Sequence, residues 1–255
     1  KREVSVGGAR LWQQSGAVEK LGRREPCRFY RLPGFVPGEE AARILELCRR
    51  SGRYRTDADS VDKAASFEYY PLQDGRWTDE SMQRLLGGIV DRSILPYVRE
   101  RYACPSCTVS DILVRRYAPG ERRTHAVHFD GHAFVTAVLG LSPPDGIEGG
   151  LYLQPEPHIS SRVFFRMEPG DLVVHSFDLQ HGVHVWKGVR YSLVLWVKDS
   201  PESVRDRTTP WYDELAEAGD PDALYNLAQN FEHGLFGRPL DLARAAELYE
   251  KSAGQ

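Results

Sequence analysis

The stretch that decides the fold runs from Gln180 to Val197: Gln-His-Gly-Val-His-Val-Trp-Lys-Gly-Val-Arg-Tyr-Ser-Leu-Val-Leu-Trp-Val. Two β-rich runs, 183–186 and 190–197, flank a turn signal at Lys187-Gly188, a pattern typical of paired antiparallel strands. Arg190 and Ser192 are two positions apart on the second run, so both side chains point to one face. A guanidinium fork beside a hydroxyl binds a carboxylate well, so this hairpin predicts an anion-binding strand.

An earlier segment, His125-Ala-Val-His128-Phe-Asp130-Gly, predicts a second functional strand. His128 and Asp130 would point to one face while Phe129 turns away. One more imidazole, from His181, would complete two histidines and a carboxylate around a metal. That facial arrangement, with its other positions open, is typical of non-haem Fe(II) and its oxygen chemistry.

The region around these two segments is rich in short strands. Besides the runs above, β-rich runs are expected at 112–117, 125–130, 134–141, 150–153, 162–165 and 171–175. Turn signals such as Pro119-Gly120 and Pro169-Gly170 separate them. Many short strands at this spacing favour an antiparallel sandwich or barrel. We therefore expect a mainly β protein with flanking helices and a small metal pocket between its strands.

The rest of the chain predicts helices and irregular segments. Residues 1–28 are polar and weakly patterned, and we expect a lead-in segment that adds an edge strand. A short strand is expected at 66–70, beside the site. Helices are expected at 37–49, from 78 towards Pro96, at 97–102 and again after 210. On the first helix, helical spacing predicts a buried face made of Ala41, Ile44, Leu45 and Cys48.

Several other histidines compete for the role of metal ligand, because seven of the eight lie between His125 and His184. Strand alternation allows only one of His181 and His184 to face inward, and the interval to Arg190 favours His181. His125 lies three positions before His128 and is expected to point to the other side, either to the surface or into a substrate pocket. His132 and His175 are expected to be structural or to support the ligands.

Composition excludes some functions and leaves the compartment open. The 255 residues carry a net charge of −3, which lacks the basic footprint of a nucleic-acid binder. No apolar run approaches the roughly 18 residues of a membrane span. The chain begins at Lys1, so we expect it to be part of a longer protein. Cys104 and Cys107 form a short local disulfide or remain plain thiols, and the location is cytoplasmic or in the secretory-pathway lumen. Cys27 and Cys48 are expected in the core.

The ordered motifs resemble the prolyl 4-hydroxylase-like Fe(II)/2-oxoglutarate dioxygenases. The motifs are Arg116-Tyr117-Ala-Pro-Gly120, His128-Phe-Asp130-Gly131, Glu148-Gly-Gly-Leu-Tyr-Leu153, Pro169-Gly-Asp-Leu172 and the segment 181–196. The resemblance covers roughly residues 29–198, including the entry Leu32-Pro-Gly-Phe-Val-Pro37 into the first helix. It implies a double-stranded β-helix (jelly roll) core in a dioxygenase domain at 29–200.

The same resemblance implies a role for each motif residue. His128, Asp130 and His181 would hold Fe(II), and Arg190 would bind the distal carboxylate of 2-oxoglutarate with Ser192 and Tyr117 assisting. O2 would be consumed, succinate and CO2 released, and ascorbate (vitamin C) would serve as reductant. Asp130 argues against a halogenase, which needs that coordination position free. The interval from His181 to Arg190 is one residue shorter than in the collagen-type enzymes, so collagen is not inferred as the substrate.

The expected reaction is hydroxylation of a C–H bond, in a prolyl or other residue of a protein or peptide. One alternative is hydroxylation of a small molecule such as a free amino acid. Another is an inactive jelly roll that serves as a protein-binding module. The candidate substrate-pocket residues are Tyr70, Arg115, Arg122, His125, Trp186 and Trp196.

The C-terminal segment 210–255 resembles one helical Sel1-like repeat. The resemblance rests on 219–228 (Gly-Asp-Pro-Asp-Ala-Leu-Tyr-Asn-Leu-Ala) and 245–253 (Ala-Ala-Glu-Leu-Tyr-Glu-Lys-Ser-Ala). Asp220 is expected as an N-cap, with Pro221 at the first helical position. A single copy must pack on the domain before it or belong to a longer array. Such repeats generally bind proteins, so the segment suggests a protein partner. Alternatively, it is a helical cap that protects a sheet edge.

Overall fold

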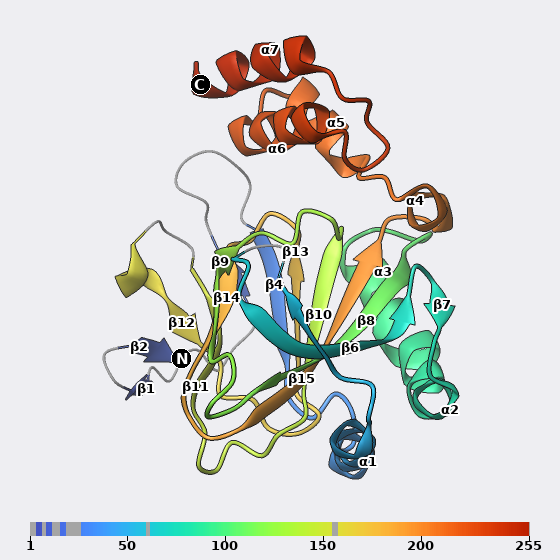
Figure 1. The fold of residues 1–255 in the computed structure, drawn as a ribbon, viewed down its shortest axis with the longest axis vertical. Coiled ribbons are helices and arrows are strands. Elements are labelled where there is room, and N and C mark those ends of the chain that lie inside the picture. Colours follow the sequence, from blue (N-terminus) through green and yellow to red (C-terminus); the bar gives the residue numbers. More distant parts are fainter. Residues whose placement is uncertain are drawn as a thin grey trace.

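The computed structural model describes residues 4–6, 9–11, 16–18, 27–59, 62–154 and 158–254. The strands of the described residues form two sheets (Figure 1). The larger sheet has the order β3 (Gly16–Val18), β4 (Cys27–Leu32), β13 (Leu172–Ser176), β10 (Val135–Gly140), β15 (Arg190–Lys198), β8 (Thr108–Tyr117), β6 (Ala65–Gln73) and β5 (Arg55–Ala58), with β7 (Arg76–Trp77) paired to β6. The smaller sheet has the order β1 (Val4–Val6), β2 (Ala9–Leu11), β12 (Val163–Phe164), β11 (Glu148–Leu153), β14 (His181–Lys187) and β9 (Thr124–His128).

From β8 to β15 the chain passes back and forth between the two sheets. β8, β10, β13 and β15 lie in the larger sheet, whereas β9, β11, β12 and β14 lie in the smaller one. Neighbours within each set are antiparallel. Eight strands arranged in this way are a jelly roll. The expectation of a mainly β, antiparallel fold with flanking helices is therefore confirmed, and every β-rich run expected after residue 108 contains a strand.

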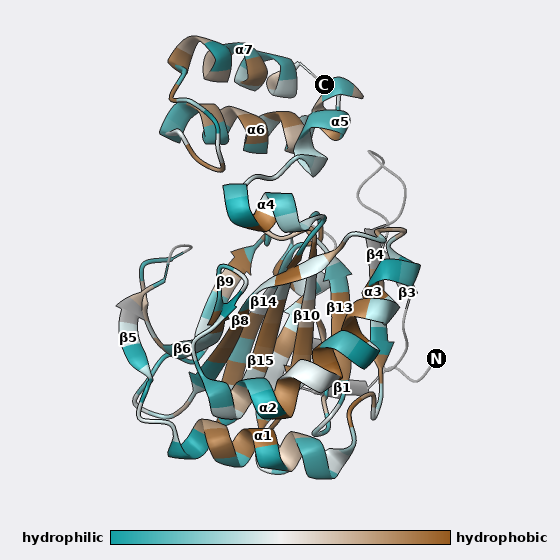
Figure 2. Cartoon of the chain, turned by 90° about the vertical axis from the view of Figure 1, so that its right-hand side faces the viewer, coloured by the Kyte–Doolittle hydropathy of each residue, from teal (hydrophilic) through white to brown (hydrophobic). Residues whose placement is uncertain are grey.

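Alternation along the strands separates two apolar layers. Val135, Ala137 and Leu139 of β10 face outward and join a core cluster with the helices, while Val138 joins a second cluster between the sheets. The outer layer is covered by α1 (Gly38–Arg50), α2 (Glu80–Ile89) and α3 (Leu95–Arg101), and Figure 2 shows the hydrophobic strands behind α1 and α2. The four α1 residues expected to be buried are all buried.

The helix expected to stop near Pro96 instead continues through it. A single π-helical turn, Val90–Ile94, joins α2 to α3, and Pro96 lies in the first turn of α3. Because the helix is continuous here, the missing N–H of Pro96 leaves a carbonyl of the preceding turn without its helical donor, and the π-helical turn lies where this break occurs. The strand expected at 66–70 is longer, spanning Ala65–Gln73, and its partners β5 and β7 were not expected.

Four helices follow β15 and lie beyond one end of the sheets (Figure 1). They are α4 (Pro201–Asp206), α5 (Trp211–Glu217), α6 (Pro221–His233) and α7 (Leu242–Ala253). Asp220 caps α6 by accepting a hydrogen bond from the Ala223 amide, as expected. Trp211 and Tyr212 of α5 pack against Phe134 and Phe177, so the segment is seated on the jelly roll. Its assignment as a Sel1-like repeat stays a prediction.

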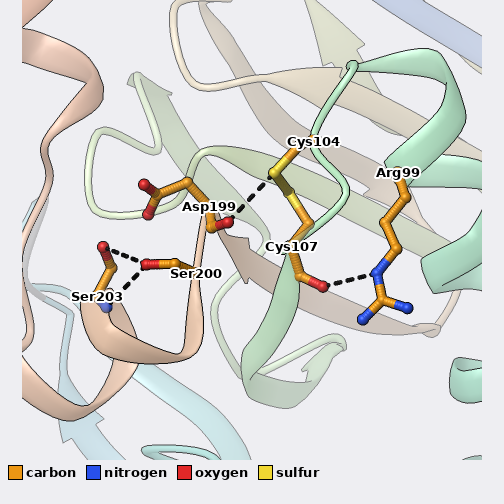
Figure 3. The surroundings of a disulfide bond; sticks show 6 residues. All are labelled: Arg99, Cys104, Cys107, Asp199, Ser200 and Ser203. Atoms are coloured by element: carbon orange, nitrogen blue, oxygen red, sulfur yellow. Dashed lines mark hydrogen bonds between the residues drawn. A yellow bond between two sulfur atoms is a disulfide. The ribbon is translucent and has the colours of Figure 1, made fainter.

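A disulfide joins Cys104 to Cys107 in the turn before β8 (Figure 3). Arg99 Nε donates to the Cys107 carbonyl at 3.0 Å, and Cys104 Sγ lies 3.3 Å from the Asp199 carbonyl oxygen. The start of β8 is thereby held against the point where the chain leaves β15. Cys48 is buried as expected, whereas the Cys27 side chain lies outside the described residues. Within the described ranges, no helix has the length and apolarity to cross a membrane.

Candidate metal centre

Two neighbouring strands and a loop bring three metal-binding side chains together between the sheets. His128 ends β9 and His181 begins β14, and the two residues are register partners. Asp130 follows two positions after His128, just beyond the end of the strand. Its carboxylate oxygens lie 3.3 Å from His128 Nε2 and 3.4 Å from His181 Nε2. One ligand atom from each residue lies within 4.8 Å of the other two, as a shared metal ion requires.

Hydrogen bonds behind the three side chains fix their orientation. His128 Nδ1 lies 2.7 Å from the Ala126 carbonyl oxygen and His181 Nδ1 lies 3.0 Å from that of Leu179. Because each Nδ1–H donates to a carbonyl, each Nε2 keeps its lone pair for a metal. Asp130 Oδ2 accepts from Thr136 Oγ1 at 2.7 Å and from Trp196 Nε1 at 3.1 Å. These contacts are the supporting shell that metal ligands commonly have.

Electrostatics favours a cation among these groups. Burial by itself would raise the pKa of Asp130, but the adjacent His181 and His128 hold that pKa well below its usual value. Burial likewise opposes the protonation of His181, yet the Asp130 carboxylate raises the pKa of its imidazole. The carboxylate therefore stabilises positive charge beside it. A divalent ion at the two Nε2 atoms would meet the same field, so the donor set fits a metal with two nitrogen ligands and one oxygen ligand.

Arg190 lies in the same interior, at the beginning of β15, and has an unmet hydrogen-bonding group. The residue is 7% exposed; its Nη1 donates to Ser192 Oγ at 3.0 Å, while its buried Nη2 has no hydrogen-bond partner among the described residues. Burial lowers the pKa of the guanidinium. A buried cation without an anion is costly, so the site fits an anionic group. Tyr117 is the register partner of Arg190 on β8, with its ring centroid 5.8 Å from the guanidinium carbon.

Gly150 on β11 leaves space beside this arginine. A Cβ built on Gly150 would lie 3.9 Å from Arg190 Nε, and the residue has a φ of +138°, which side chains rarely adopt. The absence of a side chain on Gly150 therefore leaves room for an anionic group beside the guanidinium.

The expectation that His125 points away from His128 is wrong, because β9 contains a β-bulge. His128 pairs with His181 and His125 pairs with Val183, so two residues of β9 oppose the single residue Gly182. The extra residue reverses the alternation, and both histidines then lie on one face. Their ring centroids are 4.1 Å apart.

A cavity of about 600 Å³ opens beside the metal ligands. His128 and Asp130 line it, as do four of the candidate substrate residues, Tyr70, Arg115, His125 and Trp196. His132 also lines it, with its ring against Trp196 at a centroid distance of 4.5 Å. Four of the six candidates thus lie around one cavity, and their role in substrate binding stays a prediction.

The charged side chains on the strand side of this cavity, here called the wall, are paired with one another. Arg115 donates to Glu68 at 2.9 Å and to Asp59 at 2.9 Å, and its Nη1 lies 2.9 Å from His125 Nδ1. Burial lowers the pKa of His125 to about 4, with the nearby Arg115 contributing, so the imidazole is neutral at pH 7. The charged side chains of the wall are therefore held in place, and each has a partner of opposite charge.

Two candidates lie elsewhere. Arg122 is buried behind the wall, where it pairs with Asp62 at 2.6 Å and Asp59 at 3.1 Å. Trp186 is on the outer face of β14, 37% exposed, with its ring 4.8 Å from those of Phe164 and His184. His184 therefore faces away from the centre, as alternation predicts. His175 is buried with its ring 4.2 Å from that of His181, in a supporting position.

Several residues of the site were not singled out from the sequence. Thr136 carried a weak signal, because it is a polar residue within the apolar run of β10. Asp59 and Glu68 carried none, since their partners Arg115 and His125 are remote in the chain. Tyr212 and the polar residues of α6 also line the cavity, and only tertiary packing places them there.

Solved structures with this fold include iron and 2-oxoglutarate enzymes. A 2OG-Fe(II) oxygenase family oxidoreductase from Burkholderia pseudomallei is 19% identical with a TM-score of 0.54, over 67% of this chain and 85% of its own. A Trichoplax adhaerens prolyl hydroxylase, solved with a hypoxia inducible factor peptide fragment, is 18% identical with a TM-score of 0.53 (69% and 85%). The α-ketoglutarate-dependent epimerase SnoN of nogalamycin biosynthesis is 18% identical with a TM-score of 0.51 (67% and 77%).

These likenesses establish the architecture. No protein-family model matches the chain, and no curated protein sequence does. At these identities the shared feature is the fold, and the function must be argued from the site itself. The chain has the fold of the 2-oxoglutarate and iron-dependent oxygenases.

Proposed function

We propose that this protein is an Fe(II)- and 2-oxoglutarate-dependent dioxygenase that hydroxylates a C–H bond and releases succinate and CO2. The proposal rests on one observation. Two binding sites, each of which needs a ligand to complete it, lie in the same interior between the sheets. The two histidines and Asp130 form a facial metal-binding set, and Arg190 is a buried cation with an unpartnered Nη2. A 2-oxoacid with a distal carboxylate satisfies both sites at once.

The residues have distinct tasks in this proposal. His128, Asp130 and His181 hold Fe(II), while Thr136 and Trp196 keep the Asp130 carboxylate in place. Arg190, with Ser192 and Tyr117, binds and orients the distal carboxylate of 2-oxoglutarate. The bound iron and 2-oxoglutarate supply the oxidising chemistry with O2, and ascorbate serves as reductant. The protein contributes position, orientation and exclusion of water.

The substrate we propose is a prolyl or other residue within a protein or peptide. A second cavity of about 570 Å³ adjoins the first, since Glu68 and Tyr70 line both. Each cavity suits a small ligand, but together they exceed the ~1,000 Å³ typical of small-molecule sites. An extended peptide substrate would occupy both cavities. The Trichoplax enzyme is described with a bound peptide fragment, which is consistent with this choice.

A small molecule such as a free amino acid is the second candidate, and one observation favours it. The cavity at the metal, at about 600 Å³, is by itself large enough for such a substrate.

The C-terminal helical pair, as a Sel1-like repeat, is proposed to add contacts with a protein partner.

Anaerobic titration with Fe(II) and 2-oxoglutarate tests the proposed function directly. We expect a weak visible charge-transfer band, succinate formation on admission of O2, and a mass gain of one oxygen in a member of a peptide library. A mass gain in a free amino acid instead would select the second candidate. Absence of the band and of succinate would favour an inactive jelly roll that acts as a binding module.

A further inference from the structure

One face of α6 is polar although it points towards the cavity at the metal. Four side chains of this helix line that cavity, namely Asn226, Gln229, Asn230 and His233. They follow the spacing i, i+3, i+4 and i+7, which places them on one face. Leu224, Leu227 and Ala228, by contrast, pack in an apolar cluster with Leu248 of α7. The helix therefore presents a row of hydrogen-bonding groups across the cavity from His128 and Asp130.

Asn230 in this row has an unmet donor. The residue is 5% exposed, and within the part of the chain that the structure describes its buried Nδ2 has no hydrogen-bond partner. Asn226 donates its own Nδ2 to the Asp222 carbonyl at 2.7 Å, which leaves its side-chain oxygen to accept from a ligand. A buried amide without a partner is unfavourable, so a native structure retains one where a ligand completes it.

The opposite wall indicates a ligand without charge. Asp59 and Glu68 are ion-paired with Arg115, and Arg122 also pairs with Asp59, so the charged groups on this side already have partners of opposite charge. The aromatic rings of Tyr70 and Trp196 provide the apolar surface. A neutral ligand with alternating donors and acceptors fits these walls, and the backbone of an extended peptide is such a ligand.

The helix is held at a fixed place relative to the metal ligands. Tyr212 of α5 packs on Gly131, the residue directly after Asp130, and a Cβ there would lie 2.3 Å from the tyrosine hydroxyl. Phe134 and Phe177 contact Trp211 and Tyr212 in the same cluster. Because α6 follows α5 directly, its polar face keeps its position over the cavity.

We propose that this polar face of α6 is the substrate-recognition wall of the site. It binds the backbone amides of an extended, uncharged polypeptide segment and so holds the target residue at the metal. The inference rests on the proposed function and deepens it, because it makes the C-terminal helices part of the site.

Peptide binding to the metal-free protein tests the role of the polar face of α6 and does not depend on iron, 2-oxoglutarate or hydroxylation. The probe is a pool of end-blocked, uncharged peptides of about ten residues, ~33 Å when extended. Peptides retained by the immobilised protein are identified by mass spectrometry, and the best-retained one is titrated in solution. Equally long charged peptides and free amino acids serve as comparison pools.

We expect Gln229→Ala and Asn230→Leu each to weaken binding of the selected peptide by ~3- to 10-fold, the usual effect of losing one neutral hydrogen bond. The matched control is Tyr225→Ala, because Tyr225 is exposed on α6 and packs against Tyr249 away from the cavity. Thermal melts establish that each variant is folded. Gln229 is only partly buried, so its variant remains informative if Asn230→Leu fails to fold.

Unchanged binding in both variants, or preferential retention of charged peptides or free amino acids, would overturn the inference. Failure of the proposed function gives a different pattern. The iron and 2-oxoglutarate band would then be absent while peptide binding remained sensitive to Gln229 and Asn230. If both proposals hold, the α6 variants keep the band and need ~3- to 10-fold more peptide for half-maximal succinate formation.

Discussion

The strands and the helix that face each other across the cavity are built in opposite ways. On the strand side, His128, Asp130 and His181 are each fixed by hydrogen bonds to neighbouring groups. On the helix side, the buried amide nitrogen of Asn230 has no partner within the described ranges. The difference separates two tasks. Groups that hold a metal must be oriented before it arrives, whereas groups that bind a substrate are completed by the substrate.

The largest effect is expected on the strand side, from Asp130→Ala. The variant removes the only carboxylate of the facial set, so we expect loss of stoichiometric iron and of 2-oxoglutarate turnover. Iron content after reconstitution and succinate formation are the measurements. Asp145→Ala is the control, because that carboxylate is exposed and pairs with the exposed Arg166. Retained turnover in folded Asp130→Ala protein would contradict the triad.

Next in size is the effect of Arg190→Leu. Truncating one partner of a buried ion pair costs ~2–5 kcal/mol, so the 2-oxoglutarate concentration for half-saturation should rise ~30-fold or more. Iron content should not change. Without 2-oxoglutarate the variant should melt at a temperature no lower than the parent, because it removes an unpaired buried charge. Unaltered half-saturation would show that the distal carboxylate binds elsewhere.

A smaller loss is expected from Thr136→Val, which deletes one hydrogen bond to Asp130 and keeps the shape of the side chain. Loss of such a supporting contact typically weakens metal affinity ~10- to 100-fold. Competition with a chelator measures that affinity. Thr124→Val provides the control, since Thr124 is exposed on β9. An affinity equal to that of the parent would mean that Trp196 alone orients the carboxylate.

The smallest effect should appear in the pH dependence of stability. Burial lowers the pKa of His125 to about 4 and that of His175 to about 3, below the value of 6.5 that they have when unfolded. The unfolded chain therefore binds more protons between these values, and the free energy of unfolding falls as pH is lowered from 6.5 towards 4. Each histidine contributes at most ~1.4 kcal/mol per pH unit.

Urea unfolding of the metal-free protein at pH 7 and pH 5 measures this slope. The His175→Phe variant should show a shallower loss on acidification than the parent. An identical slope in the two proteins would assign the pH dependence to other groups.

Much of the strand side could be predicted because it depends on residues that lie close together in the sequence. Alternation places Arg190 and Ser192 on one face and allows only one of His181 and His184 to face inward, and the interval to Arg190 favours His181. The apolar runs predicted the strands of the jelly roll, and the spacing on α1 predicted its buried face. Each of these inferences depends on residues within one element.

The remaining features depend on partners that lie far away in the sequence. Arg115 binds Asp59 and Glu68 across a stretch without periodicity, and Arg122 therefore lies behind the pocket wall. Trp186 was a pocket candidate by residue type, but the register of β14 turns it outward. The polar face of α6 is visible in the sequence, yet an ordinary interpretation sends such a face to solvent.

The bulge in β9 has a consequence for how this segment can change. His125 faces the site because β9 has one residue more than its partner between His125 and His128. Deleting Ala126 or Val127 would place His125 two positions before His128, where regular alternation points both histidines to one face without a bulge. The bulge is therefore what reconciles the three-position spacing of the two histidines with a shared face, and losing one residue here would straighten the strand and keep the contact of His125 with Arg115 and Asp59.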